Sequence, residues 1–209
     1  MVGARLLHEL RGYSCSRVSV EDEKRKSLCC SRSFGRVLTD LGDVVGTVAT
    51  HAARASEKLR AQGLAGRLQT ILVETSRFAN SPPPYSYSAQ LTLTLATDDT
   101  LALTRAAQRG LERIWRPGRR YVKAGLVLDG LEQAGSGLQA TLFDAAPRAL
   151  ERAKLIAALD ALNGRYGAGA VKVGAAVPAP GKPVAWAMKR DAKSPAFTTN
   201  WGERWSVKC

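Results

Sequence analysis

The feature that constrains the fold most is the order in which two hydrophobic periodicities follow one another between residues 28 and 131. Residues 87–95 alternate between apolar and polar side chains, as a strand with one buried face does. Residues 28–34, 67–75 and 121–131 are also rich in strand-forming residues, whereas the segments after the first and third strands repeat apolar side chains at helical spacing. The order strand, helix, strand, strand, helix, strand predicts the split βαβ form of an α+β fold, in which two helices back a four-stranded antiparallel sheet.

Local signals place the ends of several of these segments. Gly35 is expected to close the first strand, and either Thr39 or Asp40 can cap the helix that follows. Gly63 comes after the last apolar residue of that helix, where glycine commonly ends a helix. A proline-rich turn at residues 81–84 separates the two middle strands.

The helices of such a fold cover one face of the sheet and leave the other face open. In the third strand, Gln90, Thr92 and Thr94 point away from the apolar side chains, so we expect them on the open face. In the last strand Val122 is expected on the buried side and Lys123 on the open side. A polar and basic open face suits nucleic acid, but a face that merely contacts water has the same pattern.

The chain divides into four parts by composition. Residues 1–27 form a short helix and a polar tether in this interpretation, residues 28–135 the α+β domain, residues 136–146 a linker, and residues 147–209 a small basic C-terminal domain. The C-terminal domain is expected to begin with a helix at residues 147–163 and to hold a strand-like run around Trp186. It is therefore an appendage of a helix and a strand.

The charge balance indicates polyanionic partners. Lysine and arginine total 31 against 18 acidic residues, which gives a formal net charge of +13. Nucleic acid is the commonest polyanion that such a protein attracts, and an anionic membrane surface is the rival. No run of about 18 apolar residues is present, so we expect no membrane span, and the first residues predict no signal peptide.

The cysteines indicate neither a metal site nor a disulfide framework. They are Cys15, Cys29, Cys30 and Cys209, and their spacing matches no zinc or disulfide pattern. Reduced thiols are typical of the cytoplasm. We therefore expect a cytoplasmic protein without a bound metal.

Several segments together resemble one protein family. They are SRSFG at 31–35, ASEKLRAQG at 55–63, ATDDT at 96–100, LERIWRPGRRYVKAG at 111–125, LFD at 142–144, ALDALNGRYGAGAV at 158–171 and WAMKRDAKSPAFTTNW at 186–201. In this order they are similar to the C-terminal half of the UmuC-type Y-family lesion-bypass DNA polymerases. The resemblance implies that residues 1–27 match the end of the thumb and a tether, residues 28–135 the little-finger domain, and residues 147–209 the small C-terminal domain of these proteins.

The resemblance also implies a role in DNA repair. The family carries out error-prone translesion synthesis in the SOS response, with damaged DNA, the sliding clamp and a UmuD-type accessory subunit as partners. Its Mg²⁺-binding carboxylates lie on the palm, in the N-terminal half of the family. We therefore expect this chain to hold no catalytic residue, metal or cofactor, and to need a separate palm and fingers chain for synthesis. It is expected near the nucleoid and not at a membrane.

Basic and hydroxyl side chains are the candidates for DNA contacts, because they pair with phosphate oxygens without reading the base sequence. Most of them fall between the end of the second helix and the last strand. The candidates are Ser31, Arg32, Ser33, Arg77, Arg113, Arg116, Arg119, Arg120 and Lys123.

A second candidate site follows the α+β domain. Gln139, Leu142 and Phe143 match the short motif that bacterial polymerases present to the sliding clamp, namely glutamine, two variable residues, leucine and phenylalanine. An apolar pair on a linker can insert into a preformed pocket of a partner. The alternative is the start of a short helix that packs on the little finger.

Two function classes remain open at this point. The first is a DNA- and clamp-binding module of a lesion-bypass polymerase. The second is a non-catalytic protein or remnant that acts through the clamp and competes with whole polymerases. Affinity for DNA separates them.

Overall fold

The computed structural model describes residues 2–15, 25–76, 78, 84–135, 146–178, 184, 186, 187, 194–196 and 198–204. The strands are β1 (Ser27–Leu38), β2 (Leu64–Thr75), β3 (Ser86–Thr97) and β4 (Tyr121–Gln133), and the helices are α1 (Val2–Leu10), α2 (Leu41–Ala61), α3 (Thr100–Ile114) and α4 (Ala146–Tyr166). Two short 3₁₀ turns follow, η1 (Gly174–Ala176) and η2 (Trp201–Glu203). In this part of the chain, no helix is long and apolar enough to cross a bilayer.

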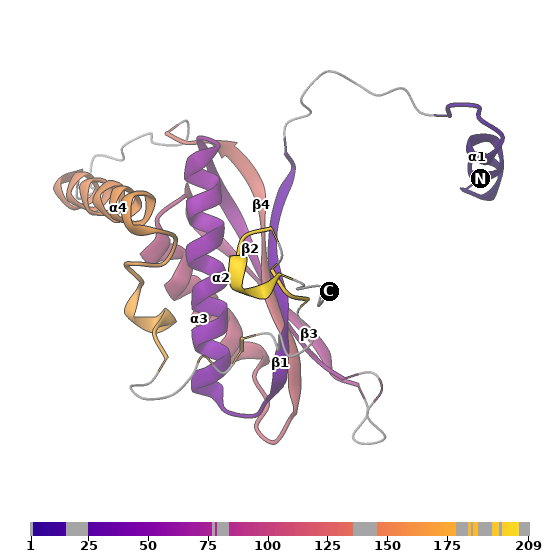
Figure 1. The fold of residues 1–209 in the computed structure, drawn as a ribbon. Coiled ribbons are helices and arrows are strands. Elements are labelled where there is room, and N and C mark those ends of the chain that lie inside the picture. Colours follow the sequence, from indigo (N-terminus) through magenta and orange to yellow (C-terminus); the bar gives the residue numbers. More distant parts are fainter. Residues whose placement is uncertain are drawn as a thin grey trace.

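The described strands form one antiparallel sheet in the order β1-β4-β2-β3. α2 packs on β1 and β4, and α3 packs on β2 and β3, so both helices cover the same face (Figure 1). This arrangement confirms the predicted α+β fold and its βαββαβ order. Among the described helices, only α2 and α3 make substantial contacts with the sheet, so none of them covers its opposite face.

The core lies between this sheet and the two helices. Its largest fully buried side chains include Leu38, Leu59, Ile71, Leu103, Leu111, Tyr121, Leu126 and Leu128. Alternate positions of the strands and one stripe of each helix supply them, as the two periodicities require. Burial of such apolar side chains stabilises the domain by roughly 1.5–3 kcal/mol for each one.

The predicted ends of α2 are confirmed, and α3 has a cap of the same kind. Of the two candidate caps, Asp40 is the N-cap of α2, and its Oδ1 accepts a hydrogen bond from the Asp43 amide at 3.1 Å. Asp99 caps α3 by accepting from the amides of Leu101 and Ala102. Gly63 follows α2 with a positive φ of 62°, a conformation that favours glycine.

Two predicted strand features were wrong, and irregular pairing explains both. β1 does not close at Gly35 but continues to Leu38, because the register passes directly from Ser33 opposite Lys123 to Leu38 opposite Tyr121. The extra residues form a bulge that turns Leu38 into the core. A second irregularity skips Val122 in the pairing of β4 with β2, so Tyr121 takes the buried position that Val122 was expected to fill.

The C-terminal region packs against the helix side of the domain. Arg60 of α2 forms a two-point ion pair with Asp160 of α4, with nitrogen–oxygen distances of 2.6 and 2.8 Å. Arg152 of α4 lies 3.5 Å from Asp99, the cap of α3. The predicted helix is therefore present, slightly longer than expected, and it binds the outer side of the helix layer.

Trp186 packs against the core, but not as part of a strand. Its ring lies over Gly46 of α2, where a Cβ atom would come within 2.8 Å of the ring. Trp186 is one of the partly buried apolar side chains that pack against the core. The described residues after Gln133 form helix and turns and no strand, so the strand expected in the appendage is not found among them.

Gly125 of β4 should be sensitive to substitution, because β1 passes very close to it. A Cβ atom there would lie 2.7 Å from Ser31 Cα and 3.0 Å from the Cys30 carbonyl oxygen, both of the backbone. We expect Gly125→Ala to lower the free energy of unfolding by about 1–3 kcal/mol, since β1 must move away. Chemical denaturation measures this change.

The matched control is Gly66→Ala in β2. There the nearest atom to an added Cβ lies at 3.5 Å, an ordinary contact, and φ is not positive. We expect this variant to be about as stable as the parent chain. Equal stability of Gly125→Ala and Gly66→Ala would contradict the close approach of β1 to β4.

Candidate nucleic-acid interface

The face of the sheet that turns away from α2 and α3 is named the open face here. Paired residues of neighbouring strands point to the same side of a sheet, and alternate residues of one strand point to opposite sides. The open face therefore consists of Cys29, Ser31 and Ser33 of β1, Lys123, Val127 and Asp129 of β4, Leu68, Thr70, Leu72 and Glu74 of β2, and Ser86, Ser88, Gln90 and Thr92 of β3. The expected placing of Gln90, Thr92 and Lys123 agrees with this register.

Ser31 and Ser33 lie on the open face of the edge strand β1. Ser31 stands opposite Gly125, and Ser33 stands opposite Lys123. Because Gly125 has no side chain, Ser31 lies directly beside the β4 backbone. Both side chains are exposed, so their hydroxyl groups are accessible to a partner on this face.

Arg32 lies on the other side of β1, apart from the two serines. It stands opposite the buried Ala124, and its charge reaches His51 on α2. Burial, followed by the positive charges of Arg54 and Arg32, lowers the pKa of His51 to about 4. Arg32 therefore contributes positive charge to the helix side of the β1 edge and not to the open face.

The open face itself carries little net charge. The Lys123 Nζ lies 3.3 Å from Glu74 Oε1, and both side chains are only partly exposed. Asp129 adds a negative charge further along β4. The centre of this face therefore offers a polyanion no excess of positive charge, and the margin of the face is the next place to consider.

That margin is the turn between α3 and β4, which carries Arg116, Arg119 and Arg120. We name these three residues the turn cluster. Gly118 gives the turn its shape with a φ of 77°, which other residues rarely adopt. The hydroxyl group of Tyr121 accepts a hydrogen bond from the Arg116 amide at 2.9 Å and donates to the Arg116 carbonyl at 3.2 Å. A buried phenol thus fixes both ends of the turn.

Aromatic rings stack beneath the turn cluster. Trp115 stacks on Tyr121 with 4.7 Å between ring centroids, and Tyr85 stacks on Tyr87 at 4.3 Å. The Arg119 guanidinium lies 5.1 Å from the centre of the Tyr85 ring, within cation–π range. Rigid rings hold the backbone that carries these arginines, so less entropy is lost when the arginines bind a partner.

Arg113 lies elsewhere, on the exposed side of α3. It borders a hollow of about 220 Å³ together with Arg109 and with residues 90–93 of β3. Arg105, Arg109 and Arg113 follow one another at intervals of four residues and fall on the same helix face. Sequence reasoning missed Arg105 and Arg109, although their spacing of four was a visible signal.

Four candidate residues lie outside the described residues. They are Arg77, in the connection of β2 to β3, and Gln139, Leu142 and Phe143, between β4 and α4. The assignment of these four residues stays a prediction.

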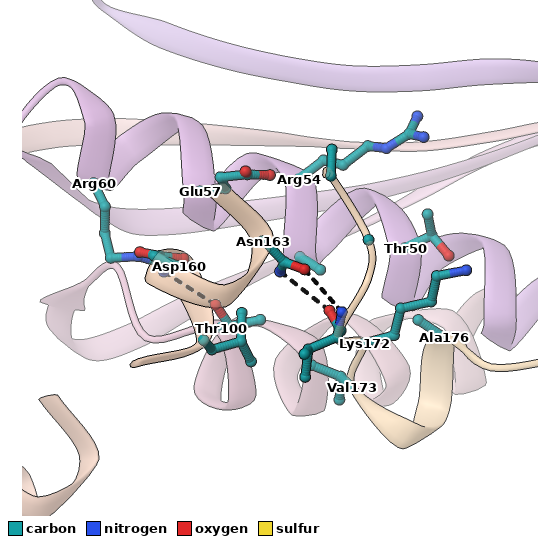
Figure 2. A pocket seen from close by; sticks show the side chains of 15 residues that line it. Thr50, Arg54, Glu57, Arg60, Thr100, Asp160, Asn163, Lys172, Val173 and Ala176 are labelled. Carbon is teal, nitrogen blue, oxygen red and sulfur yellow. Dashed lines mark hydrogen bonds and ion pairs between the residues drawn. The ribbon is translucent and has the colours of Figure 1, made fainter. Parts of the chain in front are cut away.

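The described residues offer no metal centre. No group of three or more histidine, cysteine, aspartate or glutamate side chains is close enough among them to hold a metal ion. A cavity of about 120 Å³ lies between α2, α4 and the residues before η1 (Figure 2). Figure 2 shows Arg60 and Asp160 meeting at one side of it, while Asn163 exchanges two hydrogen bonds with the Val171 backbone. These contacts join α4 to the domain, and we assign them a structural role.

Comparison with known proteins gives two matched families. Residues 25–142 match the impB/mucB/samB family C-terminal domain, and residues 153–207 match a domain of unknown function (DUF4113). The first match covers β1 to β4 with α2 and α3. The second covers most of α4 and the region after it.

The chain is also similar to individual curated proteins. It is 39% identical over 205 residues to Protein UmuC of Salmonella typhimurium, covering 98% of this chain and 47% of that protein. It is 36% identical to Protein SamB of Salmonella typhimurium, covering 95% of this chain and 46% of that protein. It is 27% identical to DNA polymerase IV of Caulobacter vibrioides, covering 84% of this chain and 41% of that protein. The chain thus spans about half the length of the curated relatives it matches.

The hydroxyl group of Tyr121 should determine how well the turn cluster is ordered. We expect Tyr121→Phe to lower the free energy of unfolding by about 1 kcal/mol, because the Arg116 amide and carbonyl lose their partner. Hydrogen exchange at residues 116–120 should become faster. Tyr87→Phe is the control, since its exposed ring keeps the stacking with Tyr85. Unchanged exchange in Tyr121→Phe would show that the turn is held by other contacts.

Proposed function

Because the chain belongs to the impB/mucB/samB family of C-terminal domains, we propose that it binds DNA without sequence preference, as the little-finger part of an error-prone translesion DNA polymerase. The observation that carries this proposal is an ordered cluster of three arginines at one end of a nearly neutral open face. The family match and the similarity to DNA polymerase IV support DNA as the partner. A part in DNA repair and in the SOS response follows from that role, and we place the protein in the cytoplasm, on the nucleoid.

The arrangement of charge suits sequence-independent binding. Arginines of the turn cluster pair with phosphate oxygens, which are identical at every base. Ser31 and Ser33 donate hydroxyl hydrogen bonds to a second stretch of backbone across the open face. Lys123 is paired with Glu74, so the part of the open face between these two sets of contacts has little net charge. The bases would therefore meet no strong charge there. Damaged bases are therefore accepted as readily as intact ones. Arg77 is a further phosphate ligand in this proposal.

Clamp binding by Gln139, Leu142 and Phe143 is the second part of the proposal. β4 starts beside the turn cluster at Tyr121 and ends at Gln133, so its 13 residues separate the arginines from the start of the linker. An extended strand of that length covers roughly 40 Å. β4 therefore ends far from the turn cluster, and we propose that the motif after it reaches a clamp while the arginines hold DNA.

Nucleotidyl transfer is assigned to another part of the protein or to another chain. We propose that these 209 residues do not polymerise by themselves and that they position DNA for palm and fingers, with a UmuD-type subunit as a further partner. The competing function is a non-catalytic clamp-interacting protein. Weak affinity for DNA would support this competitor.

The turn cluster should set the salt dependence of DNA binding. We expect the parent chain to bind duplexes of unrelated sequence equally, with log affinity falling linearly as log salt rises. Replacing Arg116, Arg119 and Arg120 with alanine should weaken binding and reduce that slope by about 2 to 3, since each phosphate contact contributes roughly 0.9. Fluorescence anisotropy at several salt concentrations measures both.

The matched control removes the same charge from the helix side. Replacing Arg105, Arg109 and Arg113 with alanine should change the slope by less than about 1. An unchanged slope in the turn-cluster variant contradicts the proposed site. An equal fall of the slope in both variants would instead indicate that phosphates also bind along α3. Arg113, one of the DNA contacts predicted from the sequence, lies on that helix.

Leu142 and Phe143 should carry most of the clamp affinity. Each contributes roughly 1.5–3 kcal/mol if it is fully buried in a pocket. We expect their joint replacement by alanine to abolish binding to the bacterial sliding clamp in a titration, while affinity for DNA stays the same. The control variant replaces Ala140 and Thr141, the variable positions of the motif, with serine. If the chain with alanine at Leu142 and Phe143 still binds the clamp, residues 139–143 are an ordinary linker.

A further inference from the structure

β3 has a free edge. Among the described strands it is the last in the order β1-β4-β2-β3, and it pairs with β2 alone. Its pairing with β2 is regular from Ser86 to Thr92 and then breaks before Thr97. Along the regular part, about every second residue turns its backbone amide and carbonyl outward. An edge of this kind is able to pair with a further strand.

A row of arginines runs beside this free edge. Arg105, Arg109 and Arg113 are exposed on one face of α3, and we name them the arginine stripe. The hollow of about 220 Å³ separates Arg109 and Arg113 from residues 90–93 of β3. Within the described residues, none of the three guanidinium groups forms an ion pair. Unpaired donors and positive charge thus face the space that an added strand would fill.

The free edge of β3 and the arginine stripe together determine which kind of partner can bind there. A second copy of the same edge would bring two arginine stripes together, and like charges repel. A nucleic-acid backbone offers phosphate oxygens, which only accept hydrogen bonds, so the outward carbonyls of β3 would stay unpaired. A peptide offers both amides and carbonyls. A peptide with acidic side chains also pairs with the arginines.

We propose that the free edge of β3 and the arginine stripe form a docking site for an extended acidic peptide, which adds to the sheet as a further strand. Side chains on one side of a strand repeat about every 6.6 Å, and helix residues four apart repeat about every 6 Å. Acidic residues at every second position of the peptide therefore face successive arginines of the stripe. The intervening side chains fall beside the polar residues Gln90 and Thr92 on the open face.

The test uses a fluorescent seven-residue peptide that alternates threonine and glutamate, with both ends blocked. We expect it to bind the full chain, and replacement of Arg105, Arg109 and Arg113 with glutamine to weaken binding by about tenfold or more. The control variant carries glutamine at Arg5, Arg11 and Arg165, which are exposed and lie outside α3. It removes the same charge and should bind as the parent chain does.

Three altered peptides separate strand addition from simple charge attraction. A peptide with glutamine for glutamate should lose binding, because the ion pairs are gone. A peptide of the same composition with its glutamates in one block should bind more weakly, because only one or two reach the stripe. A peptide methylated at alternate backbone nitrogens should not bind, because it cannot pair with β3. Hydrogen exchange at residues 86–92 should slow only with the alternating peptide.

Three results would overturn the proposal. Equal binding of the alternating and blocked peptides would leave only charge attraction. Self-association of the stripe variant, with peptide binding intact, would mean that the arginines protect the edge from other strands. Loss of DNA affinity in the stripe variant, as large as in the turn-cluster variant, would make nucleic acid the occupant of this edge.

Discussion

The structure depends on the coverage of one face of an antiparallel sheet by α2 and α3. Since side chains alternate along each strand, burying Ile71, Leu126 and Leu128 under the helices commits the intervening positions to the opposite face. The core thereby determines which residues a partner can reach on the open face. The bulge in β1 and the skipped residue in β4 are where this alternation changes, and they bring Leu38 and Tyr121 into the core next to the turn cluster.

The position of the positive charge explains how a basic chain can present a nearly neutral face. Lys123 is paired with Glu74, whereas Arg116 and Arg120 are exposed at the sheet margin and the arginine stripe is exposed along α3. The buried hydroxyl group of Tyr121 and the stacked rings beneath it order the turn cluster before any partner arrives. The C-terminal region takes up other charges, since Arg60 and Arg152 bind acidic residues at the α2–α4 and α3–α4 contacts. Some charged groups of this chain thus hold its parts together, whereas others are exposed at the surface.

Sequence periodicity predicted the element order and the polar open face, because both follow from local alternation. It could not predict the bulges, since Gly35 and Val122 change position only through pairing with distant strands. It grouped Arg113 with Arg116, Arg119 and Arg120 because they are close in the chain, yet the end of α3 directs Arg113 to another face. Arg32 was grouped with two serines for the same reason and lies across the strand from them. The contact of Arg60 with Asp160 joins residues a hundred positions apart, and no local pattern marks it.

The most direct test of the account is to map the DNA-bound surface residue by residue. Backbone amide shifts of the isotopically labelled chain, recorded by NMR during titration with a short duplex, give that map. The account predicts the largest changes at Ser31, Ser33 and residues 116–123, with small changes on the outer faces of α2 and α4. Changes confined to α3, to the β3 edge or to the C-terminal region, with the turn cluster unaffected, would contradict it.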